Sequence, residues 1–318
     1  MALKNTHFSD IYLGEEGGWM SGVPGAIDPV PTPSVDYPEV LSLRVACEEA
    51  FKNKPDQEDF SLVHGDIGFR VSVMKTIIET VFVLRRLSDT ITPLSELGIP
   101  PPMVEMMMRP AMTGLFIVSG SFGQGKTTTA SSLVAARIAR FGGIAVTIEE
   151  PPEMPLHGKH GDGYCFQTWV ERGGFGHACR QAARWAPSII FLGEIRDQET
   201  AMEALRASIN GRLVICTAHA DNCAMAIERV FALANSDGAS ADDVLGMLAT
   251  GLVAVLHQRL EKYGTGRQLM LDPLFLTEED GPGARSIIRS RRFDQLKSMV
   301  QLQRNRLIVS RRSAPPIG

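Results

Sequence analysis

From about residue 103 onward, short apolar runs alternate with stretches whose apolar positions recur at helical spacing. The runs have the length of strands, and they are apolar on both faces. We expect strands at 115–119, 144–148, 189–192 and 213–217, and helices at 127–140, 176–186, 197–208, 222–233, 239–260 and 291–303. Alternation of fully apolar strands with helices is typical of a parallel sheet buried between helical layers.

The first hundred residues show a different pattern. We expect a short strand at 10–13, a helix at 38–53 that ends before Pro55, and strands at 60–73 and 80–87, which together form a small α+β domain. Residues 21–38 contain five prolines and read as an extended loop, and residues 93–102 form a second proline-rich stretch, a hinge. This organisation predicts an N-terminal domain at 1–102 and a larger α/β domain at 103–318, which ends in a helical, basic segment.

Composition narrows the class of protein. The chain has 318 residues, of which 44% are hydrophobic and 21% are charged, so it can form two ordinary globular domains. A net charge of −4 argues against a general nucleic-acid-binding protein, and we expect no direct contact with nucleic acid. The segment 285–312 nevertheless carries nine basic residues and one acid, Asp294. It either contacts an acidic partner or membrane phosphates, or is simply a solvated terminal helix.

The five cysteines are scattered, without a C-x-x-C pair, and predict neither a disulfide framework nor a zinc ribbon. No apolar run approaches the 18 or so residues that a membrane helix needs, and the N-terminus lacks the apolar segment of a signal peptide. We therefore expect a soluble, cytoplasmic protein that reaches a membrane only through a partner.

One motif carries most of the chemistry. Residues 120–127, GSFGQGKT, match G-x-x-x-x-G-K-[ST] and lie between an apolar strand and a helix. The candidate phosphate-binding residues are Gly120, Ser121, Phe122, Gly123, Gln124, Gly125, Lys126, Thr127 and Thr128. Glycines allow backbone N–H groups to surround phosphate oxygens, and the start of the helix adds further N–H groups. We expect Lys126 to reach the β- and γ-phosphates of ATP and the Thr127 hydroxyl to bind Mg²⁺.

Three further clusters follow predicted strands, at 149–153 (EEPPE), 193–197 (GEIRD) and 217–222 (TAHADN). Ligands of parallel sheets gather at this end of the strands. Hydrolysis of a nucleoside triphosphate needs a carboxylate that activates water, acids that hold Mg²⁺ and a group that senses the γ-phosphate. The clusters therefore indicate a hydrolytic site. No N-K-x-D tetrapeptide appears on any strand after the loop, which argues against a GTPase, whereas the loop alone leaves a small-molecule kinase open.

Together, the four motifs resemble the type II/type IV secretion ATPase superfamily, with particular likeness to PilT-type retraction ATPases and to DotB/TraJ-like ATPases of type IVB secretion and conjugation. VSGSFGQGKTTTASSLV resembles the family's phosphate loop, VTIEEPPE its Asp box, PSIIFLGEIRDQETAMEAL its Walker B segment and GRLVICTAHADNCAMAIERV its His box. Residues 69–101 are similar to part of its N-terminal domain, and ARSIIR at 284–289 to a C-terminal motif of retraction ATPases.

The resemblance implies roles for individual residues. Glu153 matches the catalytic glutamate, Glu194 the Walker B glutamate near Mg²⁺, and His219 the nucleotide-sensing histidine. Arg70 and Arg85 match arginines of the N-terminal domain that reach the γ-phosphate. The chain departs from the family at Glu150, which stands where an aspartate is usual, and in lacking the four zinc-binding cysteines of assembly-type members.

The resemblance also implies the fold and the function. The fold class is α/β, with a RecA-like P-loop NTPase domain after a smaller, PAS-like α+β domain. The function is that of a hexameric ATP- and Mg²⁺-dependent motor of a type IV pilus, conjugation or type IVB secretion system, peripheral at the inner membrane through platform or secretion-apparatus proteins. The alternatives are an assembly- or export-type ATPase, and a regulatory module that binds nucleotide without hydrolysing it.

Overall fold

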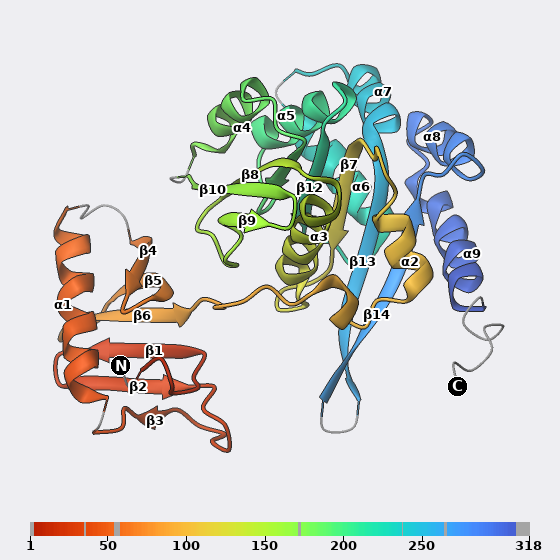
Figure 1. The fold of residues 1–318 in the computed structure, drawn as a ribbon. Helices are drawn as coiled ribbons and strands as arrows, with labels where there is room; N and C mark the ends of the chain where they lie inside the picture. Colours follow the sequence, from red (N-terminus) through yellow and green to blue (C-terminus); the bar gives the residue numbers. More distant parts are fainter. Residues whose placement is uncertain are drawn as a thin grey trace. The chain divides into compact units, whose positions relative to one another are not determined.

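The computed structural model describes residues 3–34, 36–53, 58–170, 173–236, 238–263 and 266–309. These residues form two compact units, coloured red to orange and yellow to blue in Figure 1. The first unit extends to Thr90 and also includes Glu153–Pro155. The second holds the rest of the chain, starting at Ile91. Residues 91–102 thus belong to the second unit, where Leu94 and Ile99 are buried in the core.

The first unit is a single antiparallel sheet with a helix on one face. Its strands are β1 (Asp10–Gly14), β2 (Gly17–Ser21), β3 (Val30–Pro31), β4 (Asp59–His64), β5 (Ile67–Lys75) and β6 (Thr80–Arg86), in the order β3-β2-β1-β6-β5-β4. Helix α1 (Tyr37–Asn53) packs Val40, Leu43 and Cys47 against the inward-facing strand residues. Alternation along the strands directs one set of side chains to this core and leaves the other set on the opposite face.

The second unit is an eight-stranded sheet between helices. Its strands are β7 (Gly114–Ser119), β8 (Gly143–Glu149), β9 (Gly158–His160), β10 (Gly163–Trp169), β11 (Ile189–Leu192), β12 (Leu213–Ala218), β13 (Leu252–Tyr263) and β14 (Gly266–Phe275), in the order β14-β13-β7-β12-β11-β8-β10-β9. The six strands from β13 to β10 are parallel, and the two edge strands are antiparallel. This is the mostly parallel sheet of a RecA-like domain.

Helices cover both faces of this sheet. They are α2 (Pro101–Met107), α3 (Lys126–Phe141), α4 (Phe175–Arg184), α5 (Gln198–Ile209), α6 (Cys223–Ala234), α7 (Ala241–Gly251), α8 (Gly281–Arg289) and α9 (Leu296–Val309), with 3₁₀ turns η1 (Leu94–Glu96) and η2 (Phe293–Gln295). Successive residues of β7 enter different cores: Ile117 packs with α4–α7, and Phe116 packs with α2 and α3. The central strands are apolar throughout because both faces are buried.

The structure confirms the α/β class and the strand–helix alternation, and it corrects two predicted elements. The predicted helix at 239–260 ends at Gly251, and the apolar run that follows is the buried strand β13. The predicted strand at 60–73 is a hairpin, because Gly65 and Asp66 adopt positive φ values of 56° and 65° and reverse the chain. The loop at 21–38 contains the short strand β3.

Two further observations concern the described residues only. None of their helices is both long and apolar enough to cross a bilayer. All five cysteines are buried free thiols.

The core of the second unit makes a direct prediction. Phe191 is fully buried in β11, whereas Phe166 of β10 is 47% exposed. Replacing Phe191 with alanine leaves a cavity and lowers the free energy of unfolding by about 3–5 kcal/mol. Replacing Phe166 lowers it by less than about 1 kcal/mol. Urea denaturation of the two variants checks this difference, and equal losses would contradict the assignment of the core.

Candidate active site

The phosphate loop leaves the carboxyl end of β7 and enters α3. Gly123 and Gly125 have φ values of 70° and 77°, a left-handed conformation that favours glycine. Gly125 precedes the first residue of α3, and no side chain caps that helix end. The N–H groups of the first helical turn are therefore available to an anion, and the positive end of the helix dipole favours negative charge there.

Lys126 lies inside the loop and is only 8% exposed. Its Nζ donates to the carbonyl oxygen of Ser121 at 2.9 Å and lies 3.4 Å from Nδ1 of His219. Phe122, which is 77% exposed, stacks on the His219 ring with a centroid distance of 6.3 Å. The loop therefore concentrates positive charge next to uncapped helix N–H groups, an arrangement suited to phosphate oxygens.

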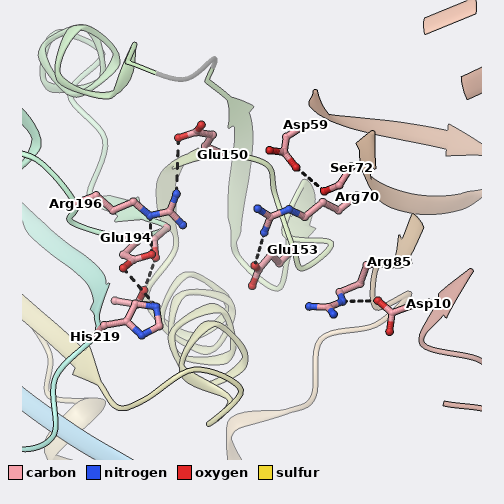
Figure 2. Close-up of polar contacts among 12 residues, drawn as sticks. Asp10, Asp59, Arg70, Ser72, Arg85, Glu150, Glu153, Glu194, Arg196 and His219 are labelled. Atoms are coloured by element: carbon pink, nitrogen blue, oxygen red, sulfur yellow. Dashed lines mark hydrogen bonds and ion pairs between the residues drawn. The ribbon is translucent and has the colours of Figure 1, made fainter. Parts of the chain in front are cut away.

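A continuous polar network links the ends of three strands (Figure 2). His219, after β12, places Nε2 at 3.5 Å from Oε1 of Glu194, which follows β11. Arg196 places Nε at 2.7 Å from the other carboxylate oxygen of Glu194, and its Nη1 lies 3.9 Å from Oε2 of Glu150, after β8. Parallel pairing of β8, β11 and β12 brings these positions to one edge of the sheet, as the strand pattern predicted.

Burial lowers the pKa of His219 from its ordinary value of 6.5. The Glu194 carboxylate acts in the opposite direction, and the Lys126 ammonium adds to the lowering. A second histidine, His257 of β13, is opposite Ser119 in the strand register, with Nδ1 at 3.3 Å from the Ser119 hydroxyl. Burial lowers the pKa of His257 as well. Both rings are therefore neutral at pH 7.

The donor set near the loop suits a small, hard cation. Within the described residues the Thr127 hydroxyl has no hydrogen-bond partner, and Glu194 offers carboxylate oxygens. Mg²⁺ prefers such ligands and keeps several waters and phosphate oxygens, so two protein groups suffice. No group of three or more His, Cys, Asp or Glu side chains among the described residues could hold a metal ion by itself.

Other members of the predicted clusters have structural roles. Asp197 caps α5 by accepting from Thr200 N at 2.8 Å, and Asn222 caps α6 by accepting from Met225 N at 3.0 Å. Glu149 is buried and accepts from Gln167 Nε2 at 2.9 Å. These side chains thus stabilise helix starts and a side-chain contact at the edge of the sheet.

The remaining predicted residues form a group in the first unit. Arg70 of β5 and Arg85 of β6 are directly opposite each other in the strand register. Arg85 Nε lies 2.7 Å from Oδ1 of Asp10 on β1, and Arg70 Nη1 lies 3.7 Å from Oε1 of Glu153. Figure 2 shows both pairs. Two like charges facing each other across strands are unfavourable, and the carboxylates of Asp10 and Glu153 offset this repulsion.

Sequence reasoning named Arg196 within a cluster without giving it a role, and it missed Asp10. The position of Arg196 two residues after Glu194 was a usable signal for pairing. Asp10 and Arg85 are 75 residues apart, and only the strand register of β1 and β6 brings them together.

Comparison with known proteins identifies the family. The family model for type II/IV secretion system proteins matches residues 28–307. The chain belongs to the type II/IV secretion ATPase family. The type IV pilus retraction ATPase PilT of Pseudomonas aeruginosa is 31% identical to it over 304 residues, which are 92% of this chain and 85% of PilT. The pilus ATPase PilU of the same organism is 31% identical over 76% of this chain but only 62% of PilU.

Solved structures of secretion ATPases agree with this fold. A structure of the pilus retraction motor PilT with bound ADP superposes with a TM-score of 0.77, at 28% identity, and covers 94% of this chain and 87% of that one. The Legionella pneumophila ATPase DotB superposes with a TM-score of 0.76 at 20% identity, covering 94% of this chain and 85% of DotB. These matches confirm the predicted fold class and family.

The two neutral histidines of this secretion ATPase predict a pH dependence. A histidine in the unfolded chain takes up a proton near its ordinary pKa of 6.5, whereas the native rings resist protonation, so acid favours unfolding. The free energy of unfolding should fall as the pH decreases from about 7.5 to about 5.5. Urea denaturation at several pH values across this range should show that the free energy of unfolding depends less steeply on pH in the double variant His219→Asn/His257→Asn. The exposed His177→Asn serves as control, and an unchanged slope in the double variant would refute the explanation.

Proposed function

We propose that this chain is an ATP-hydrolysing motor of a type IV pilus, conjugation or type IVB secretion system. The observation that carries the proposal is the convergence of Lys126, His219 and Glu194, linked by contacts of 3.4 and 3.5 Å, beside a glycine-rich loop with an uncapped helix. A loop of this kind binds phosphates, and a neighbouring carboxylate and neutral histidine are suited to distinguishing a triphosphate from a diphosphate.

In this proposal, the loop N–H groups and Lys126 bind the β- and γ-phosphates of ATP. Thr127 and Glu194 would hold Mg²⁺, which neutralises charge on the phosphate oxygens when bound. The neutral ring of His219 forms a hydrogen bond with a group beside the γ-phosphate, either as donor or as acceptor. Arg196 keeps Glu194 and Glu150 at one edge of the sheet through its contacts with both carboxylates.

Glu153 is the proposed general base, which orients and deprotonates the attacking water. Its ion pair with Arg70 connects the base to one of the two proposed arginine fingers. Triphosphate charge competes with Glu153 for the Arg70 guanidinium, so nucleotide binding frees the carboxylate for water. Arg85 supplies a second positive charge as negative charge develops on the transferred phosphoryl group.

The motor is proposed to work as a hexamer at the cytoplasmic side of the inner membrane, attached to platform or secretion-apparatus proteins. Hydrolysis would change the position of one compact unit against the other and so move a partner. The long match to PilT, over 92% of this chain, favours a retraction-type motor. The assembly ATPase PilB of Thermus thermophilus is 33% identical over only 61% of this chain and 21% of PilB.

The role of Glu153 is tested by Glu153→Gln, which keeps the shape but cannot accept a proton. Turnover measured by phosphate release should fall by about 100-fold or more. Binding of ATP, measured by calorimetry, should remain within a few-fold of the parent because the phosphate loop is intact. The exposed Glu105→Gln should behave as the parent does. Normal turnover by Glu153→Gln would show that another group activates water.

The role of Arg85 is tested by Arg85→Ala. An arginine finger contributes about 10³-fold or more to turnover, so phosphate release should fall by roughly that factor. Arg85→Lys should restore little, because a point charge cannot replace the planar, forked guanidinium. The exposed Arg184→Ala controls for loss of an arginine elsewhere. Parent-like turnover of Arg85→Ala would remove this residue from the mechanism.

A further inference from the structure

Strand β13 extends beyond the strand that carries the phosphate loop. It pairs in parallel with β7 as far as His257, which is opposite Ser119. Ser119 is the last residue of β7, and the loop begins at Gly120. From Gln258 onward β13 stays paired with β14 on one side, and on the side where β7 has ended it contacts the loop.

Three contacts connect β13 to the loop. Gln258 donates from Nε2 to the backbone carbonyl of Gln124, and the backbone N–H of Leu260 donates to Oε1 of Gln124. The third contact is steric: a Cβ added to Gly120 would lie 2.5 Å from the Gln258 carbonyl oxygen. Strand β13 thus lies against both Gly120, the first residue of the loop, and Gln124.

The hydrogen bond to the Gln124 carbonyl has a consequence for the next peptide N–H. The carbonyl of Gln124 and the N–H of Gly125 belong to one planar, trans peptide group, so they point in opposite directions. Holding the carbonyl against β13 directs the Gly125 N–H away from β13. The same bond fixes the entry to α3, whose first residue is Lys126.

The burial of Gln258 indicates that this bond is the reason for a polar residue at this position. Gln258 is 1% exposed, and within the described residues its Oε1 has no hydrogen-bond partner. A buried acceptor without a partner destabilises the fold, so an apolar side chain of equal size would serve stability as well or better. The donor Nε2 is the part of the side chain that forms a contact, and the contact is with the loop.

We propose that Gln258 is a positioning residue for triphosphate binding: it orients the Gln124–Gly125 peptide group so that the phosphate loop is preformed. The inference rests on the proposed role of the loop in binding ATP. It adds a residue from outside the four motifs, more than 130 positions along the chain from the loop. Gln258 acts through the loop and contacts no reacting atom.

The test is Gln258→Met, which keeps the length of the side chain and removes the amide donor. The matched control is Gln268→Met, on the exposed part of the neighbouring strand β14. Calorimetric titration with Mg·ATP should show about tenfold weaker binding by Gln258→Met, the effect of one lost hydrogen bond. The control should bind as the parent does. The melting temperature of Gln258→Met without nucleotide should match that of the parent, because a buried acceptor without a partner is removed together with the bond.

Hydrogen exchange separates positioning from general stability. In Gln258→Met without nucleotide, the peptide covering residues 120–126 should exchange faster, whereas β11 and β12 should keep their protection. Binding within twofold of the parent would overturn the inference, and so would weaker binding accompanied by a lower melting temperature and faster exchange throughout the sheet. Lys126→Ala tells the two proposals apart. Its full retention of ATP affinity would overturn the proposed function, whereas loss with Lys126→Ala and parent-like binding by Gln258→Met would overturn the role of Gln258 alone.

Discussion

The site depends on a buried ammonium group held inside a backbone turn. Lys126 is almost entirely removed from solvent, and its Nζ contacts the carbonyl oxygen of Ser121 and the ring of His219. The positive φ values of Gly123 and Gly125 form the turn, and the start of α3, which has no side-chain cap, presents helix N–H groups at the same place. These features together favour a polyanion such as a triphosphate.

Strand pairing brings charged side chains together at two further places in the molecule. The parallel sheet brings Glu194, Arg196 and His219 to the edge from which the loop leaves, because the carboxyl ends of β11, β12 and β7 are adjacent. In the first unit, the register of β5 and β6 sets Arg70 opposite Arg85, and the carboxylates of Glu153 and Asp10 offset their repulsion.

Local pattern was enough to predict the loop, the central strands and their helices, because each depends on residues close together in sequence. Residues 252–260 were predicted as helix because a buried strand and a buried helix are both continuously apolar over so short a run. Asp197 and Asn222 were counted with the catalytic clusters, although the structure uses them as helix caps. The contacts of Gln258 with the loop and of Asp10 with Arg85 could not be predicted from the sequence, because they arise from strand register between distant segments.

The most direct measurement is a crystal structure of this chain with Mg²⁺ and a slowly hydrolysed ATP analogue. The account predicts phosphate oxygens within hydrogen-bond distance of the backbone N–H groups of residues 123–127 and of Lys126 Nζ, with the cation on the Thr127 hydroxyl and Glu194 in its water shell. A nucleotide bound elsewhere, or a loop that stays empty at saturating nucleotide with Lys126 intact, would contradict the account.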